Sequence, residues 1–450
     1  MAKTDSLRIV QLTPGAGKMF CGACLRDNAL VAALRAMGHS VVMAPLYLPM
    51  TLDEDDQSLG TPLFYSGINV YLDQQSPLFR RAPQWLHRLF ASPQLLKLAS
   101  GAAANTRAQE LGELTISMLR GEEGNQAREL DDLIRWLRVE KPDVVCLSNV
   151  LLAGMARRIR REVGVPVVCS LQGEDYFLDA LPEAHRQTAW ETTAERAADI
   201  DLFIAPSRYF ADFMRQRLRV PAERMRILAN GISLEGYGTP ASPAPAGEAG
   251  PPVLGFFARM CRDKGLDLLT DAYIRLKKRA GLEKLRLRVG GSCGPADLPL
   301  VNSLRTRLNE QGHGEDVEFC PNLSRAEKVA FLRSLTVFSV PARWKEAFGL
   351  SIIESLAAGV PVVQPDHGAF PELIASTGGG ILCAPQDEAA LAEALGGLLM
   401  APQRAQAMGR AGRAAVIAHY SVETMAKEMA RLCREVSNRG RGPEFGSAAA

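Results

Sequence analysis

The chain has 450 residues, more than one ordinary hydrophobic core accommodates, so two or three domains are expected. Its residues are 47% hydrophobic and 23% charged, as in globular proteins, and a formal net charge of +2 does not indicate nucleic acid as a partner. No apolar run approaches the roughly 20 residues of a membrane span, and because the first residues lead directly into a strand, no signal peptide is expected.

Short apolar strands alternate with helices along the first half, which is typical of a parallel α/β sheet. Apolar residues between Leu25 and Met37 recur at helical spacing, and Ser207 is placed to cap a later helix. The strands expected in this half are Arg8–Leu12, Ser40–Ala44, Val144–Leu147, Val165–Leu171 and Leu202–Ala205.

The region from about 52 to 124 breaks this alternation with mixed charged and apolar pieces, and a helical insertion is expected there. Within it, residues 77–100 combine aromatic and aliphatic side chains with arginines and a lysine. Such a segment can lie on an anionic membrane surface, and packing onto the first domain is the alternative. We therefore expect a cytoplasmic protein whose membrane contact, if it has one, is peripheral and at the inner face.

The nine cysteines are scattered and odd in number. Cys146 and Cys169 lie in apolar runs, which predicts reduced core thiols of a cytoplasmic protein. Cys21 and Cys24 form a Cys-x-x-Cys, which admits a redox or zinc role, but no second pair has ligand spacing. We interpret these two cysteines as small residues of a tight loop.

Residues 236–252 are rich in Pro, Gly and Ala, which predicts a linker between a first domain at 1–235 and a second at 253–415. A last helix is expected within 416–440, and 444–450 resemble translated cloning sites. The second domain should hold strands at Val253–Phe257, Leu285–Val289, Val317–Phe319, Val337–Val340, Pro361–Val363 and Gly380–Cys383, with a capping box at Ser324 and Glu327. Two such halves predict two Rossmann-like domains facing a central cleft, with ligands outside the carboxyl ends of the strands.

Glu346 and Glu354 lie eight residues apart around Phe348, Gly349 and Leu350, where a strand leads into a helix. The free N–H groups and positive end of such a helix suit a phosphate. Carboxylates on either side can accept hydrogen bonds from hydroxyls. Hydroxyls on both sides of a diphosphate describe a nucleotide-sugar, and the alternative is a surface helix with two solvated glutamates.

This string, with Phe-Gly after the first Glu and Ala-x-Gly-x-Pro-Val after the second, resembles the retaining GT-B glycosyltransferases of family 4. The resemblance covers about residues 8–436, more loosely in the first half. It implies a GT-B fold with an N-terminal acceptor domain, a C-terminal donor domain and a last helix that crosses back. It also implies sugar transfer from a UDP-, GDP- or ADP-linked donor to a sugar or lipid-linked acceptor, without a metal or other cofactor.

Arg259 and Lys264 lie in a loop between a strand and a helix, where two cations can neutralise a leaving diphosphate. The alternative is ordinary solvated charge. The pair matches the family's Arg and Lys-Gly, whose cations hold the donor phosphates. The resemblance further implies that Glu346 positions sugar hydroxyls near the reacting carbon, that Glu354 holds the ribose, and that the amides of 348–350 face the phosphate. It places Glu372 in a structural role or near the ribose.

The loop after the first strand, 13–22, lacks both the Walker A pattern and the dinucleotide fingerprint, so it favours neither ATP nor NAD. Counting back from Gly38-His39 aligns Gly22 with the second glycine of a pair in the resembled family, and Cys21 replaces the first. A glycine there lets the backbone approach the diphosphate.

Gln172 stands where the family often has a histidine beside the transferred sugar. An amide can hydrogen-bond a sugar hydroxyl but cannot protonate it. The following Glu174 and Asp175 either contact the acceptor or cap the next helix.

Asp53-Glu-Asp-Asp56 contains the Asp-x-Asp with which other glycosyltransferases hold Mn²⁺, but it lies in a polar loop without a preceding strand. We interpret it as a solvated turn and expect no metal. Two alternatives to a transferase stay open. One is a nucleotide-sugar epimerase on the same scaffold, and the other is a catalytically silent nucleotide-sugar-binding protein, which Gln172 keeps open.

Overall fold

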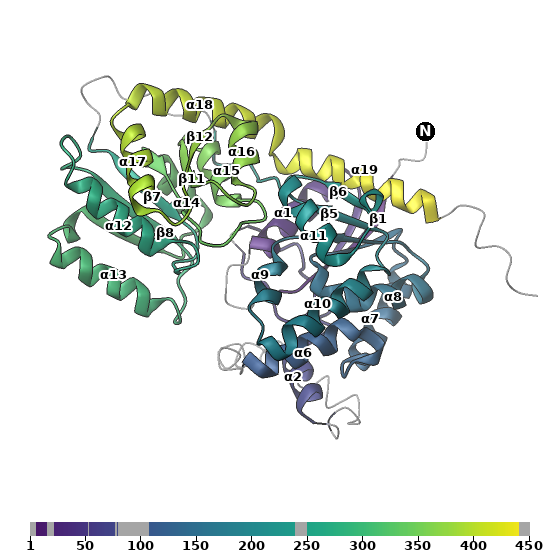
Figure 1. Ribbon diagram of the computed structural model, residues 1–450. Coiled ribbons are helices and arrows are strands. Elements are labelled where there is room, and N and C mark those ends of the chain that lie inside the picture. Colours follow the sequence, from purple (N-terminus) through teal and green to yellow (C-terminus); the bar gives the residue numbers. More distant parts are fainter. Residues whose placement is uncertain are drawn as a thin grey trace, which may run out of the picture. The chain divides into compact units, whose positions relative to one another are not determined.

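The computed structural model describes residues 6–15, 22–52, 54–76, 79, 108–238 and 250–440. The chain divides into two compact units: unit 1 is Met1–Ala229 with Glu423–Ala450, and unit 2 is Asn230–Val422. Each unit has its own six-stranded parallel sheet with helices packed around it (Figure 1). The prediction of an α/β fold with two Rossmann-like domains is therefore confirmed.

The sheet of unit 1 has the strand order β2-β1-β3-β4-β5-β6, and its topological switch point lies between β1 and β3. Every residue of β3, β4 and β5 is buried, because parallel strands are covered on both faces. The strands are β1 (Arg8–Thr13), β2 (Ser40–Pro45), β3 (Val144–Leu147), β4 (Val167–Ser170), β5 (Leu202–Ala205) and β6 (Met225–Ile227).

The helices of unit 1 begin at α1, and Ser207 caps α11 as expected, since its side chain accepts the Phe210 N–H at 3.0 Å. In the region of the expected insertion the described residues form α2 and α6. Residues 77–100, apart from Phe79, lie outside the described part of the chain. The main helices are α1 (Gly22–Ala36), α2 (Gly67–Gln75), α6 (Ala108–Arg120), α7 (Ala127–Glu140), α9 (Glu174–Asp179), α10 (Glu183–Ala197) and α11 (Arg208–Leu218).

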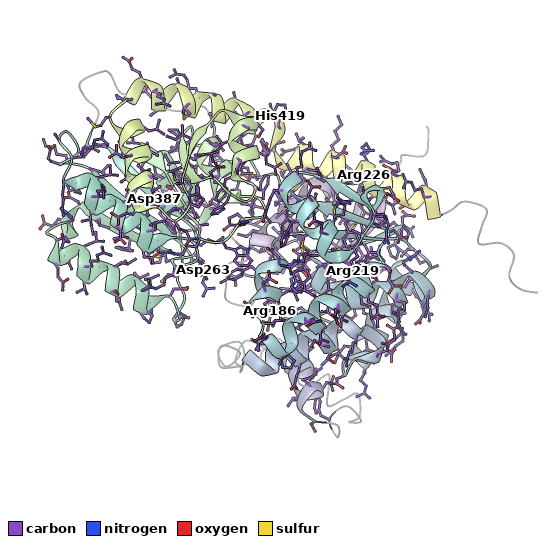
Figure 2. The ribbon with its side chains drawn as sticks, in the orientation of Figure 1. Arg186, Arg219, Arg226, Asp263, Asp387 and His419 are labelled. Atoms are coloured by element: carbon purple, nitrogen blue, oxygen red, sulfur yellow. The ribbon has the colours of Figure 1, made fainter. Side chains whose placement is uncertain are left out.

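The last helix, α19 (Val422–Gly440), returns the chain to unit 1. Its Ser437 hydroxyl donates to the Asp143 carbonyl at 3.1 Å, and the Cys433 sulfur lies 3.8 Å from that of Cys146 in β3. Arg226 of β6, labelled in Figure 2, lies 3.8 Å from Glu435 of the same helix. The end of α19 is thus part of the core and rim of unit 1.

The sheet of unit 2 has the strand order β12-β11-β10-β7-β8-β9, and its topological switch point lies between β7 and β10. Its strands are β7 (Val253–Phe257), β8 (Arg286–Gly291), β9 (Val317–Pro321), β10 (Val337–Phe338), β11 (Val362–Pro365) and β12 (Gly380–Cys383). Its helices are α12 (Leu266–Lys277), α13 (Leu298–Glu310), α14 (Arg325–Arg333), α15 (Leu350–Ala357), α16 (Phe370–Thr377), α17 (Glu388–Leu399) and α18 (Pro402–His419).

The capping box of α14 is present as expected: Ser324 and Glu327 exchange side-chain and backbone hydrogen bonds. Within the described ranges, no helix combines the length and the apolar character needed to cross a membrane.

Candidate active site

The candidate residues of unit 2 follow β7 and β10, the two strands at the topological switch point of its sheet. Arg259 and Lys264 lie in the loop between β7 and α12, and Glu346 lies in the loop between β10 and α15. Because β7 and β10 are hydrogen-bonded neighbours, both loops leave the same edge of the sheet. Parallel sheets of this kind bind ligands at such a switch point.

Backbone contacts hold the two loops together. A Cβ on Gly265, which has φ +74°, would lie 2.0 Å from the Pro341 carbonyl oxygen, so the loops approach at a distance that only glycine permits. The Arg343 N–H donates to the carbonyl of Asp263, a residue labelled in Figure 2, at 2.8 Å. Lys264 is thereby placed beside the chain that leads to Glu346.

Lys264 and Glu346 form a hydrogen-bonded ion pair across these loops. Burial alone lowers the pKa of Lys264, but the Glu346 carboxylate more than offsets this, so the pKa is raised. The ammonium therefore stays charged at neutral pH. With 35% of the lysine and 22% of the glutamate side chain exposed, an incoming ligand can reach both partners.

The turn before α16 fixes the backbone of Glu346. Its carbonyl accepts the Ala369 N–H at 3.0 Å, and a Cβ on Gly368, at φ +60°, would lie 2.8 Å from the Glu346 nitrogen and oxygen. The turn at Gly368 thus fixes the backbone of Glu346. Glu372 itself lies in the first turn of α16.

Helix α15 begins at Leu350 without a side-chain cap. Its cap residue is Gly349, whose φ of +122° disfavours any side chain, and a Cβ there would approach Ile352 Cδ1 to 2.9 Å. Phe348 is buried, with its ring centroid 6.1 Å from that of Tyr420. No side chain caps the first turn, although the Ile352 N–H donates to the Gly349 carbonyl at 3.1 Å, so only the amides before Ile352 have the character of an uncapped helix N-terminus, which suits an anion.

Glu354, in the second turn of α15, pairs with Lys328 of α14 at 2.9 Å. Lys328 was missed from the sequence. It lies directly after the capping box of α14, where a lysine ordinarily faces solvent, yet it is buried. Each of the two glutamates of the motif thus has a lysine partner from another element.

Arg259 has a partner of its own: its Nε donates to both oxygens of Asp297, at 3.0 and 3.3 Å. Asp297 was also missed, since it lies 38 residues away at the start of α13. Arg259, Lys264 and Glu354 are thus each paired with a residue from another element, and none is a solvated surface charge alone.

In unit 1, Gly22 is the first residue of α1. Gln172 follows β4, and its amide nitrogen donates to the Ser148 carbonyl at 2.9 Å and to Asp27 Oδ1 at 3.4 Å. Asp27 is buried and also accepts from Thr13 and Arg26. Because both neighbours are acceptors, the amide must turn its NH₂ toward them, and its carbonyl oxygen points away from these two partners.

Glu174 is the first residue of α9, and the cap position before it is held by Gly173, which has no side chain. The Glu174 carboxylate is buried and accepts the Val150 N–H at 3.0 Å and the Gln172 N–H at 2.6 Å. It therefore ties the loop after β4 to the chain after β3. The neighbouring Asp175 is also buried.

The pKa of Glu174 predicts a stability change with pH. Burial raises it from the ordinary value of 4.5 to about 7, although three backbone N–H groups oppose the shift. The folded protein then binds this proton more tightly than the unfolded chain, so stability from this group is present below pH 4.5 and lost as pH rises through 7. We expect the free energy of unfolding, measured with urea across that window, to fall more steeply in the wild type than in Glu174→Gln.

The exposed Glu183→Gln is the matched control and should keep the wild-type pH slope. Equal slopes in Glu174→Gln and the wild type would contradict the assignment.

Outside the regions left undescribed, no three His, Cys, Asp or Glu residues come together as a metal site would require. Cys21 and Asp53 both lie outside the described residues.

Two Rossmann-like units, each built on a six-stranded parallel sheet, are the architecture of the GT-B glycosyltransferases. The family model "Glycosyltransferase Family 4" matches residues 117–235, and "Glycosyl transferases group 1" matches residues 241–415. Together the two models span more than half of the chain and match part of each unit. The chain belongs to the GT-B glycosyltransferases of family 4.

Two relatives illustrate the range of the sequence likeness. The chain is 30% identical to the lipopolysaccharide core mannosyltransferase LpsB of Rhizobium meliloti over 183 residues, which is 40% of this chain and 50% of that protein. It is 27% identical to a GDP-mannose-dependent phosphatidylinositol monomannoside mannosyltransferase of Mycobacterium tuberculosis, over 66% of this chain and 75% of that protein. The matched region thus spans only half the length of the first relative.

Solved structures share the fold over almost the whole chain. Sucrose-phosphate synthase from Thermosynechococcus elongatus superposes with a TM-score of 0.71 at 19% identity, covering 96% of this chain and all of that one. HepE from Anabaena, in complex with UDP, superposes with a TM-score of 0.66 at 17% identity, covering 95% and 100%.

Proposed function

We propose that this chain is a retaining glycosyltransferase that moves a sugar from a nucleotide-sugar donor to an acceptor hydroxyl. The observation that carries the proposal is the group at the β7 and β10 edge of unit 2. Two cations, an uncapped helix and two lysine-paired carboxylates lie on three adjacent elements there. Phosphate, sugar and ribose each meet a fitting group in this arrangement.

Donor binding would exchange the partners of Lys264. The diphosphate brings oxygens that compete for the ammonium, and the sugar brings hydroxyls that donate to the released Glu346 carboxylate. The ion pair therefore keeps both groups placed until the donor arrives. Arg259 and the amides at the start of α15 add positive potential on the same phosphates.

The proposed transfer needs no protein base. The bond from the anomeric carbon to the leaving phosphate oxygen breaks while the bond to the acceptor oxygen forms on the same face. The acceptor proton passes to a phosphate oxygen of the leaving nucleoside diphosphate. Lys264 and Arg259 stabilise the charge that grows on that diphosphate.

The donor is proposed to carry UDP, GDP or ADP. The Anabaena structure holds UDP, and the Mycobacterium relative is described as GDP-mannose-dependent. Unit 1 is proposed to bind a sugar or lipid-linked acceptor, with Gln172 as a hydrogen-bonding contact. Donor turnover with and without acceptor tests this function. A transferase needs the acceptor, an epimerase isomerises the donor alone, and a silent binder does neither.

The anomeric configuration of the product is expected to match that of the donor. Glu174 and Asp175 are the candidate bases of an inverting reaction. Both side-chain oxygens of Glu174 already accept backbone N–H groups and Asp175 is buried, so neither carboxylate is well placed to deprotonate an acceptor. Proton NMR of the new linkage early in the reaction measures this. An α-linked donor that gives a β-linked product would refute retention.

Activity is also expected to be independent of divalent metal, because Arg259 and Lys264 supply the positive charge that Mg²⁺ or Mn²⁺ supplies elsewhere. The transfer rate should be the same in EDTA and in Mn²⁺. A rate abolished by EDTA and restored by Mn²⁺ would refute this proposal.

A further inference from the structure

Asp297 occupies the position of a helix cap but does not cap its helix. It is the residue before α13, where an aspartate ordinarily accepts a first-turn amide, and no such hydrogen bond is formed. Its Oδ1 instead accepts Arg259 Nε at 3.0 Å, and its Oδ2 accepts the Gly294 N–H at 3.0 Å. The carboxylate is thus directed to Arg259 and Gly294 and not to the first turn of α13.

The backbones that carry these two side chains are held against each other. The Met260 N–H donates to the Ser292 carbonyl at 2.9 Å. A Cβ on Gly291, at φ +120°, would lie 1.9 Å from the Ala258 carbonyl oxygen, so only glycine allows this approach. With the loop of Arg259 fixed on both sides of that residue, the position of its guanidinium depends on what its side chain contacts.

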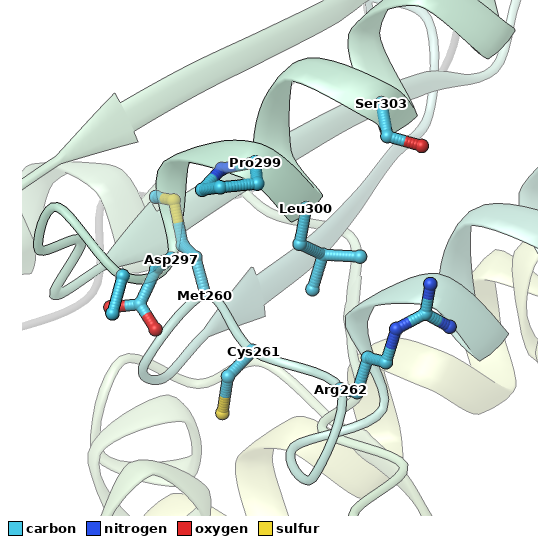
Figure 3. A pocket seen from close by; sticks show the side chains of 8 residues that line it. Met260, Cys261, Arg262, Asp297, Pro299, Leu300 and Ser303 are labelled. Carbon is cyan, nitrogen blue, oxygen red and sulfur yellow. The ribbon is translucent and has the colours of Figure 1, made fainter.

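The Asp297 carboxylate is the group that sets this position. Its side chain is 6% exposed, whereas that of Arg259 is 53% exposed. No other residue of the described chain accepts a hydrogen bond from Arg259. Asp297, Met260 and Leu300 are among the residues that line a pocket of about 400 Å³, and Figure 3 shows their side chains. The hydrogen-bonded ion pair with the buried Asp297 is therefore the contact that places the half-exposed guanidinium.

We infer that Asp297 is a positioning residue, which holds Arg259 by Nε and leaves the fork of Nη1 and Nη2 for the donor's diphosphate. The inference rests on the proposed function, in which Arg259 stabilises the departing diphosphate. An asparagine cannot replace Asp297, because both carboxylate oxygens accept N–H groups. An amide offers one acceptor, and its NH₂ would oppose either Arg259 or Gly294.

The test is a double-mutant cycle of Asp297→Asn and Arg259→Ala, with kcat and donor KM measured separately and thermal melting used to confirm folding. We expect Arg259→Ala to lower kcat by about 10²–10³-fold and Asp297→Asn to lower it by about 10-fold through misplacement. In the Arg259→Ala background, Asp297→Asn should change kcat by less than about 2-fold, because its effect passes through Arg259.

Asp271→Asn is the matched control. Asp271 also forms an ion pair with an arginine, Arg307 of α13, and its loss should leave kcat unchanged. Wild-type kcat in Asp297→Asn beside an impaired Arg259→Ala would overturn the inference alone. A 10-fold loss in both backgrounds would also overturn it, whereas wild-type kcat in Arg259→Ala would overturn the proposed function.

If Asp297→Asn does not fold, Arg259→Lys tests the same point. A lysine keeps the charge but has no Nε for Asp297 to hold and no fork, so we expect at least about a 10-fold loss of kcat. Full activity of Arg259→Lys would overturn the positioning role.

Discussion

Replacing Lys264 by alanine is expected to lower kcat by about 10²–10³-fold while the protein stays folded. The ammonium is proposed to meet charge that grows only as the diphosphate leaves, so its loss falls on kcat more than on donor KM. The partner left behind, Glu346, is partly exposed and can be hydrated, which limits the cost to stability. Steady-state kinetics with a saturating acceptor measure the effect, and thermal melting confirms the fold.

Arg262→Ala is the matched control, since Arg262 lies in the same loop but pairs with Asp267 and is 71% exposed. Its kcat should stay close to that of the wild type. A Lys264→Ala enzyme with wild-type kcat, or an Arg262→Ala enzyme impaired as strongly, would show that the phosphates lie elsewhere.

Replacing Glu346 by glutamine is expected to lower kcat by about 10²-fold. The substitution keeps the shape but removes the charge that holds Lys264 and that accepts sugar hydroxyls. Part of the loss arises through Lys264, so Glu346→Gln should cost less in a Lys264→Ala background than in the wild type.

Glu393→Gln serves as the control, because Glu393 forms an exposed pair with Arg279 elsewhere in unit 2. Unchanged kcat in Glu346→Gln would remove this carboxylate from the reaction. Strictly additive losses in the double variant would mean that the ion pair has no part in catalysis.

The strands show which parts of the fold the apolar pattern of the sequence predicts. Val253–Phe257 and Gly380–Cys383 have the bounds predicted from their apolar runs. In unit 1, by contrast, strand β6 was missed because it is only three residues long, lies at the sheet edge and contains Arg226. Strand β10 pairs over only two residues, since the chain leaves the ladder after Phe338.

The pairings inside the site are beyond sequence reasoning. Lys264 and Glu346 are 82 residues apart, and Lys328 reaches Glu354 across 26. The sequence contains many lysine and glutamate pairs at such separations. Which of them form an ion pair depends on the order of the strands in the sheet. Glu346, Glu354, Arg259 and Lys264 could be predicted from local motifs. Each lies in a loop between a strand and a helix or in the helix that follows, and such a junction has a recognisable pattern of neighbouring residues.

Glu174 illustrates the same limit in unit 1. Its position shortly after a strand suggested a contact with the acceptor or a cap of the next helix. The structure shows a buried carboxylate held by the amides of Val150 and Gln172, which depends on the packing of β3 beside β4. Likewise, the orientation of the Gln172 amide follows from the buried Asp27, which no short motif connects to it.

The central claim is that the loops after β7 and β10 hold the diphosphate of a nucleotide-sugar, and a thermal-shift measurement with UDP, GDP and ADP tests it most directly. A ligand that binds only the folded state raises the melting temperature by mass action. We predict that one of the three raises the melting temperature of the wild type, and that the rise is lost in the Arg259→Ala, Lys264→Ala double variant. No rise with any of them, or an equal rise in the double variant, would contradict the account.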